Sequence, residues 1–399
     1  MSARAPLSEL ERERQRWRNL LAAVASITVF GFALGEMFPL LALIMERAEL
    51  SDGVIGINNA MQPVGILLAG FTVPPLVTRY GAKRVLICAA CIVAAIVLAY
   101  PATPIFWAWF GLRIVQGAAV STLFSISEAW IVQSADGEAR ARIIALYTSV
   151  LAASFGLGPA LIAVTGIEGI LPFAIGAVVL LAAMLPVLSF NELSDPEESS
   201  EGQVGSFFAF LGRAPVLLLS VGVFAIFDAA CLGFLPVYAL RKGLDQQTAA
   251  LTLTILVLGN VALQFPVGWL GDKFRKRLVM AGCVLITGLG AALLPVTVGT
   301  PAMWVVLIVI GTTSSGIYTM ALSEIGERFT GSDLVTGTSA MATMWGAGAL
   351  IGALVTGWAM QTFGPDGFPY LEAAVQLTFF LVIIWRERDK SRHSGSGRA

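Results

Sequence analysis

Long apolar stretches separated by short polar segments dominate this chain. Twelve of them are candidates to cross a bilayer, because a helix needs about 20 apolar residues to span the hydrocarbon core. The predicted spans lie near residues 20–44, 53–77, 84–103, 105–132, 142–166, 169–190, 215–239, 248–271, 277–297, 302–326, 334–360 and 368–385. The pattern therefore predicts an all-α integral membrane protein with twelve transmembrane helices.

The second half of the chain repeats landmarks of the first. FPLLAL at 38–43 returns as LPVYAL at 235–240, and Ser127-Glu128 returns as Ser323-Glu324. Two six-helix halves related by such a repeat are typical of secondary transporters, whose binding site lies between the halves. We expect an N-terminal half at 1–190, an acidic cytoplasmic linker at 191–213, a C-terminal half at 214–386 and a cytoplasmic tail at 387–399.

Composition supports a membrane class. The 399 residues are 57% hydrophobic and 13% charged. This composition differs strongly from that of a soluble domain of the same length, so we predict that the chain lies in a lipid bilayer. The mean hydropathy is +0.81. No block of basic residues indicates nucleic acid, and no nucleic-acid partner is expected.

The distribution of Lys and Arg orients the chain, because positive residues stay on the cytoplasmic side. One side collects 21 of them, and the other side only Arg47, Arg241 and Lys242. We therefore expect a multi-pass protein of the bacterial inner membrane with both termini in the cytoplasm.

Catalytic and metal chemistry is not expected. The only histidine, His393, lies in the tail, and the Cys88-x-x-Cys91 pair lies inside an apolar span, whereas zinc and redox motifs need polar surroundings and further ligands. The prediction is no enzyme, no cofactor and no metal site.

A charged loop joins the eighth and ninth spans. Its sequence, GWLGDKFRKR at 268–277, resembles the G-x-L-x-D-R-x-G-R-R loop of the major facilitator superfamily, with Arg275 in place of the second glycine. An acid at a helix end followed by several bases can hold an inner gate shut and release it. The alternative is ordinary positive-inside charge, although topology does not require Asp272. The candidate gate residues are Gly268, Asp272, Lys273, Lys276 and Arg277.

The first-half copy of this loop departs from the superfamily pattern. Thr78 replaces the acid, while Arg79, Gly81 and Lys83 are kept. The nearest acids are Glu128 and Glu324, at the inner ends of the fourth and tenth spans. We predict that each clamps the basic loop of its own half; a plain role as a helix-end charge is the alternative.

The fourth span carries RIVQG at 113–117, which resembles the R-x-x-Q-G signature of the superfamily's fourth helix. A charge at membrane depth costs about 2.5–3.5 kcal/mol on insertion scales, so it faces protein or water and usually has a partner. Arg113 and Glu36 each lie eight residues from the outer end of their spans, about 12 Å deep. We predict that they are partners.

Further polar residues are candidates for substrate binding or coupling. Asp228 lies near the middle of the seventh span; the alternative is a hydrogen-bonded role between helices. Spans one, four, seven and ten, which line the cavity in the superfamily, would then each carry an ionisable residue. The full set of candidates is Glu36, Asn59, Gln62, Arg113, Gln116, Asp228, Asn260, Gln264 and Tyr318.

The resemblance to the major facilitator superfamily covers nearly the whole chain, and Ser127-Glu-Ala-Trp130 with Tyr318 and Glu324 also resembles its YcaD-like bacterial branch. It implies a secondary active transporter of a small molecule that works by alternating access, is coupled to protons and acts as a monomer. The alternative is a membrane sensor or receptor that keeps the fold without transport.

Overall fold

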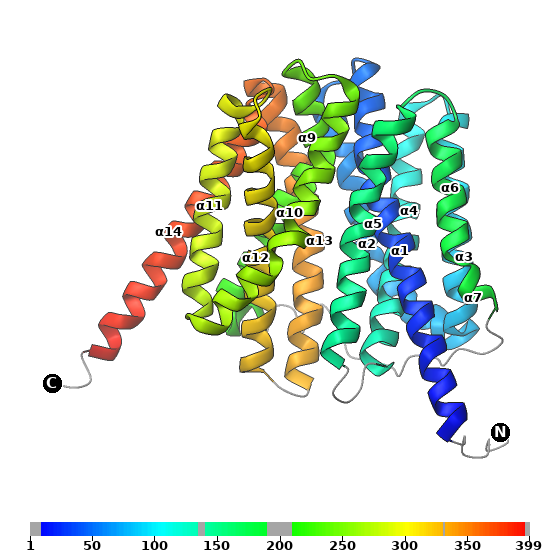
Figure 1. The fold of residues 1–399 in the computed structure, drawn as a ribbon, viewed down its shortest axis with the longest axis horizontal. Helices are drawn as coiled ribbons and strands as arrows, with labels where there is room; N and C mark the ends of the chain where they lie inside the picture. The colour runs from blue at the N-terminus through cyan, green and yellow to red at the C-terminus, as the bar shows by residue number, and fades with distance from the viewer. Residues whose placement is uncertain (1–8, 135–139, 190–209, 330–331, 396–399) are drawn as a thin grey trace.

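Every regular element in the described part of the chain is a helix (Figure 1). The computed structural model describes residues 9–134, 140–189, 210–329 and 332–395. The predicted linker at 191–213 lies mostly outside these ranges. The elements are α1 (Glu9–Arg47), α2 (Asp52–Tyr80), α3 (Ala82–Ala102), α4 (Phe106–Ser134), α5 (Arg140–Thr165), α6 (Leu171–Ala183), α7 (Leu185–Ser189), α9 (Pro215–Arg241), α10 (Gln246–Lys273), α11 (Lys276–Thr297), α12 (Ala302–Arg328), α13 (Ser332–Phe363) and α14 (Gly367–Gly395).

The prediction of twelve membrane-crossing helices is confirmed: within the described ranges, 12 helical segments are long and apolar enough to span a membrane. One of them, Leu171–Leu188, joins α6 and α7 across Met184. Helices α1–α7 form one group and α9–α14 the other, side by side (Figure 1). The start of α1 and the end of α14 lie at the same edge of the bundle, which we name the terminal side; the opposite edge is the far side (Figure 1).

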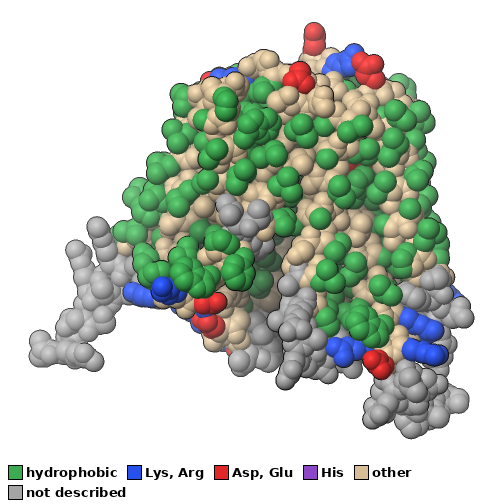
Figure 2. Space-filling model, in the orientation of Figure 1, with side chains coloured by type: hydrophobic (Ala, Val, Ile, Leu, Met, Phe, Trp, Pro, Cys, Tyr) green, Lys and Arg blue, Asp and Glu red, His purple; other side chains and the backbone are tan. Residues whose placement is uncertain are grey.

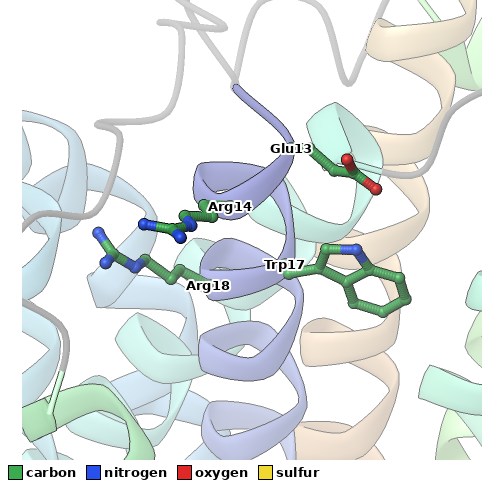
Figure 3. A pocket seen from close by; sticks show the side chains of 4 residues that line it. All are labelled: Glu13, Arg14, Trp17 and Arg18. Carbon is green, nitrogen blue, oxygen red and sulfur yellow. The ribbon is translucent and has the colours of Figure 1, made fainter. Parts of the chain in front are cut away.

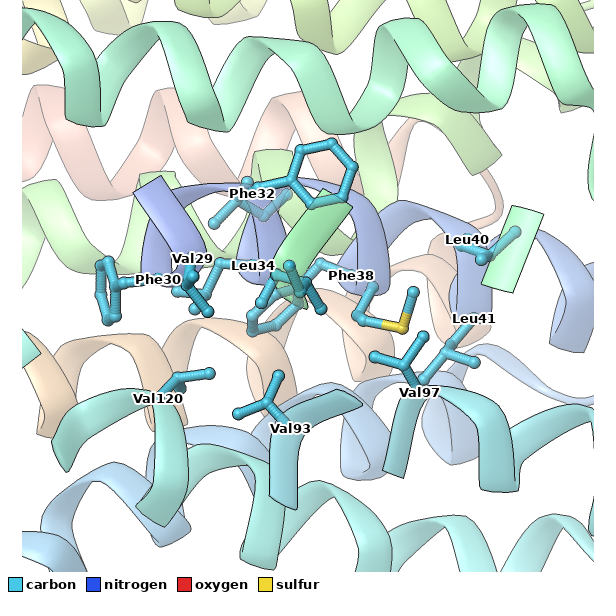
Figure 4. Packing of buried hydrophobic residues seen from close by; sticks show 14 of the residues in the cluster. Val29, Phe30, Phe32, Leu34, Phe38, Leu40, Leu41, Val93, Val97 and Val120 are labelled. Atoms are coloured by element: carbon cyan, nitrogen blue, oxygen red, sulfur yellow. The ribbon is translucent and has the colours of Figure 1, made fainter. Parts of the chain in front are cut away.

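The first helix of each group lies at the centre of the molecule. The most apolar stretch of α1 is 89% buried and that of α9 67% buried. A helix that is apolar on all faces is stable only when it is packed on all sides. Figure 4 shows α1 side chains, among them Val29, Phe38 and Leu41, packed against Val93, Val97 and Val120 of α3 and α4. The central position of α1 and α9 brings their polar residues into the interior.

The two groups pack on each other through α2 with α13, α5 with α10, and α1 with α9. Gly56 and Gly357 allow a close approach of α2 and α13: a Cβ on Gly357 would meet the carbonyl oxygen of Asp52 and the Cα of Gly56. Close backbone packing between small residues is what holds helices together in lipid, where the hydrophobic effect does not drive association.

The surface shows a broad hydrophobic band with charged side chains gathered at its two margins (Figure 2). Such a band is expected of a protein whose flanks contact lipid tails. Between the two groups the surface is hollowed toward the terminal side (Figure 2). On the face shown, the two groups of helices thus flank a hollow that lies toward the terminal side.

Candidate functional site: a buried arginine, an acidic cavity face and two charged margins

Arg113 on α4 is fully buried, and its guanidinium is held by side-chain amides of α2. It donates from Nε to Asn58 at 3.2 Å, from a terminal nitrogen to Asn59 at 2.9 Å, and from the other to Gln62. It also lies 4.4 Å from the ring centroid of Phe38 on α1. Amide oxygens and an aromatic face therefore solvate this charge inside the first group of helices.

Two glycines explain why α2 supplies these partners. A Cβ on Gly117 would meet the carbonyl oxygen of Gln62, and one on Gly65 would meet the carbonyl oxygen of Ile114. The backbones of α2 and α4 therefore approach closely at the level of the arginine. The close approach explains the glycine of the R-x-x-Q-G segment. Gln116 of the same segment accepts a hydrogen bond from the Tyr100 hydroxyl at 2.8 Å.

The predicted pairing of Glu36 with Arg113 is wrong. Glu36 on α1 is fully buried, but both of its carboxylate oxygens lack a hydrogen-bond partner. Its side chain points at α6, where it fills the space that a Cβ on Gly176 would occupy. Equal depth predicted the pair, but the direction of each side chain around its helix separates the two residues.

A second set of residues connects α4 of the first group with α9 and α12 of the second. Asp228 on α9 is half-buried, and within the described residues nothing donates a hydrogen bond to it. One turn away, the ring of Phe224 lies 5.5 Å from that of Tyr318 on α12. Glu128, exposed on α4, interacts electrostatically with Tyr318 from the other group. We name Glu128, Phe224, Asp228 and Tyr318 the cavity face.

The other candidates have mixed outcomes. Asn260 on α10 is half-buried, and the side chain of Gln264 lies outside the described residues. Asn59 and Gln62 belong to the arginine network and not to the cavity face. Each keeps its amide nitrogen buried without a partner in the described structure, and that of Asn59 points at Gly233 on α9.

At the terminal side, the predicted clamp is present in the second group of helices only. Arg277 donates from Nε to Glu324 at 2.9 Å, and Arg328 also pairs with Glu324. Asp272 is exposed and makes no hydrogen bond or ion pair within the described residues. Further charged contacts at this margin are Lys276 with Glu327, and Lys273 above the ring of Trp269 at 4.8 Å.

The predicted clamp of Glu128 on the first basic loop is not formed. Glu128 interacts electrostatically with Tyr318 of the other group, while Arg79 lies over the ring of Tyr80 at 5.2 Å. Gly81, with φ of 82°, makes the turn between α2 and α3 and sets the position of Lys83. A residue with a side chain rarely adopts that backbone conformation.

At the far side, charged and polar residues join the two groups. Arg241 at the end of α9 donates to Glu46 on α1 at 2.6 Å and to Asp52 on α2 at 2.9 Å. The backbone N–H of Gly53 on α2 donates to Gln361 on α13 at 3.0 Å. We name these five residues the far-side lock, because every contact in it crosses between the two groups.

Figure 3 shows a different hollow, on the flank of α1 at the terminal side, lined by Glu13, Arg14, Trp17 and Arg18. Arg14 and Arg18 point to one side of the helix, and Glu13 and Trp17 to the other. Trp17 is 57% exposed. A tryptophan beside arginines at a helix end is typical of an anchor at the membrane interface, so this hollow is not a substrate site.

Comparison with known proteins places the chain in a family. The sequence profile of the Major Facilitator Superfamily matches residues 20–256 and 217–399. This chain belongs to the Major Facilitator Superfamily.

Two relatives within the superfamily match over nearly their full length. The MFS-type transporter YfkF of Bacillus subtilis (strain 168) is 24% identical over 91% of this chain and 92% of its own. The MFS-type transporter YcaD of Escherichia fergusonii is 23% identical over 94% and 97%. The chain is a multi-pass membrane protein of a transporter family, and its relatives are of the YcaD-like branch.

Solved structures support the superfamily fold. The nucleoside transporter NupG superposes with a TM-score of 0.76 over 93% of this chain and 98% of its own, at 12% identity. A mutant of NupG superposes with a TM-score of 0.78, also at 12% identity. At this identity the likeness establishes the fold alone.

Sequence reasoning missed two features of this superfamily member. The far-side lock uses Arg241, one of the three basic residues that the sequence predicts for that side. The small number of basic residues there was the sequence signal that could have pointed to Arg241. Glu372 and Gln376 on α14 are fully buried without hydrogen-bond partners in the described structure. An acid inside a predicted span was the signal for Glu372.

Proposed function

We propose that this chain is a secondary active transporter of a small molecule that works by alternating access and is coupled to protons. One observation carries the proposal: the two helix groups are joined by the far-side lock, while the space between them opens at the terminal side. A central space with access from one side only corresponds to one half of a transport cycle. The other half requires that the lock open and the terminal side close.

The orientation proposed for this cycle follows the charge asymmetry. With 21 of the 25 Lys and Arg residues on the terminal side, that side is the cytoplasm and the conformation is open inward. We propose the bacterial inner membrane as the location and a monomer as the working unit. Labelling of single cysteines in intact cells tests this, in a background without the four native cysteines. A cysteine at exposed Glu49 should react from outside and one at Arg84 should not.

Proton coupling is assigned to the cavity face. Asp228 and Glu128 belong to this set, and neither has a cationic partner within the described structure. The proton affinity of an acid differs between a conformation in which it is solvated by water and one in which it is buried in protein. Asp228 is the leading coupling residue, because it lies near the middle of a central helix.

The terminal-side charges support transport over a static receptor. Asp272 is unpaired in the inward-open conformation, and Glu324 holds Arg277 and Arg328 of its own group. Charges that are partly paired in one conformation can stabilise the opposite one, whereas a receptor without movement has no use for them.

The experiment is uptake by purified protein in liposomes, with a panel of labelled metabolites and drugs and an imposed pH gradient. Accumulation that collapses with the gradient supports proton-coupled transport. Accumulation that ignores the gradient would refute the coupling, and no transport of any compound, with binding intact, would support the receptor alternative.

A further inference from the structure

Glu372 lies in the seam between α14 and α9. Its side chain is fully buried, and both carboxylate oxygens lack a partner in the described structure. It interacts electrostatically with Cys231 on α9, which places its carboxyl group against that helix. One turn along α14, Gln376 is also fully buried, with both amide atoms unpartnered. The backbone of α14 approaches α11 here, since a Cβ on Gly288 would contact Gln376.

The repeat gives this seam a counterpart in the first group. Pro39 and Pro236 are 197 residues apart, as are Pro172 and Pro369, so α1 corresponds to α9 and α6 to α14. In the first group the carboxylate of Glu36 fills the seam between α1 and α6 at Gly176. The residue that corresponds to Gly176 is Ala373, next to Glu372. Each group therefore buries one acid between its first and last helices, contributed by opposite members of the pair.

Among the described residues, no cation lies beside an ionised carboxylate in this seam. The cations nearest along the chain are at the ends of the membrane spans: Lys242 pairs with Asp366 at the far side, and Arg386 ends the span of α14. A buried charge without partners is far less stable than the neutral acid. We propose that Glu372 is a proton-binding site, which holds a proton in the inward-open conformation and releases it when α9 moves against α14. The release step rests on the proposed function; the bound proton does not.

The groups around Glu372 favour a proton over a metal ion. On α9, Cys231 interacts electrostatically with Glu372 and also with Asp228, which lies one turn earlier and belongs to the cavity face. The ionisable residues of α11 are Lys276, Arg277 and Cys283, and α13 contributes Asp333; all of these lie toward the terminal side. Metal ions such as Ca²⁺ need six or more oxygen ligands. Within the described residues no group of three His, Cys, Asp or Glu residues is placed to bind one.

Thr356 on α13 is a further buried polar residue, on the side of α13 that faces α9. Gly352, one turn earlier, contacts Ile226 on α9, and the Thr356 hydroxyl is buried without a partner in the described structure. Asp228 provides the exit, because a movement that parts α9 from α14 would let water reach Glu372 along the helix that carries both acids. Release then transfers the proton from the Glu372 carboxyl to water or to the Asp228 carboxylate, and leaves Glu372 ionised.

The test is infrared spectroscopy of the full-length protein in lipid, because a protonated carboxyl has a C=O band that a carboxylate lacks. The difference between wild type and Glu372→Gln at neutral pH should contain one protonated carboxyl band. The matched control is Glu168→Gln, an acid whose side chain is 73% exposed and paired with Arg47, which should show carboxylate bands only. Carboxylate bands for Glu372→Gln would overturn the proposal.

Two further measurements keep the outcome clear. Glu372→Asp retains an acid, so a proton bound at this position should persist there with a shifted band; loss of the band would count against the site. Neither spectrum requires transport, so absence of uptake in liposomes would refute the proposed function while leaving the bound proton established. If uptake is present, Glu372→Gln should lower gradient-driven accumulation at least tenfold, and unchanged accumulation would overturn the release step.

Discussion

Arg241 at the far end of α9 donates two hydrogen bonds to the Glu46 carboxylate on α1, which belongs to the other group of helices. A third bond reaches Asp52 at the start of α2, whose side chain is only 7% exposed. This contact joins the far-side ends of α1 and α9, the central helices of the two groups. Charged groups that pair across such a boundary stabilise one state without contributing to the fold of either group.

Replacement of Arg241 should open the far side. Truncation of one partner of a largely buried, hydrogen-bonded charge pair costs about 2–5 kcal/mol; partial exposure here favours the lower end, and 2 kcal/mol is about a 30-fold change in population. Distances between spin labels at Glu49 and Gln247 in Arg241→Met should therefore shift toward longer values. The control is Arg47→Met, which breaks an exposed pair with Glu168 inside one group. An unchanged distance distribution in Arg241→Met would rule out the lock.

Asp228→Asn should abolish gradient-driven accumulation and preserve exchange or binding of the substrate. The amide mimics the protonated acid permanently, so the cycle can no longer exchange a proton at this position. The measurement is accumulation against exchange in proteoliposomes, at several pH values. If Asp228→Asn shows normal pH-dependent accumulation, Asp228 is only a polar contact between helices. Another residue must then couple transport to protons.

Asp272→Asn should slow turnover by at least tenfold with little effect on folding. The carboxylate is exposed and has no partner among the described residues, so under the proposed cycle we expect it to act when the terminal side closes. Transport by monodisperse protein in liposomes, compared with Glu168→Gln, measures the effect. Wild-type turnover in Asp272→Asn would eliminate the gating role.

Arg113→Leu should destabilise the protein far more than Glu36→Gln does. Loss of the guanidinium leaves three buried amide oxygens without donors, and each unsatisfied group costs about 1–3 kcal/mol. Glu36 does not contact Arg113, so its replacement leaves that network intact. Thermal unfolding in detergent compares the two variants. Equal losses of melting temperature would contradict the arrangement of the network.

Acidification should weaken the contact that joins the start of α13 to Arg213, two residues before the start of α9. Hydrogen bonds from Arg213 hold the pKa of the Asp333 carboxyl below its ordinary value, at 2.7 and 2.9 Å. Its stabilising contribution is complete above the ordinary aspartate pKa of about 4 and is lost as the pH falls through the lowered value. Both side chains are about half exposed, so the effect is local. Hydrogen exchange near residues 336–340 should accelerate below pH 4 in wild type and show no such step in Asp333→Asn.

Several elements of this protein follow from its sequence. Apolar length alone predicts the twelve helices, since a bilayer fixes how many residues a span requires. The repeat of Pro39 and Pro236 indicates two matched groups, and the R-x-x-Q-G segment marks a buried arginine with an adjacent glycine at Gly117. The Arg277 contact with Glu324 was also predictable, because both residues must lie at the same end of adjacent helices.

Only the tertiary structure decided which polar residues meet. Depth along a helix can be counted from the sequence, but direction around it depends on packing. Because α2 and α4 pack closely at Gly65 and Gly117, Arg113 forms hydrogen bonds with the side-chain amides of α2. Gly176 on α6 leaves space for the side chain of Glu36. The far-side lock likewise depends on how two groups of helices sit against each other. Contacts of that kind join residues about 190 positions apart in the chain, such as Asp52 and Arg241, and no local pattern encodes them.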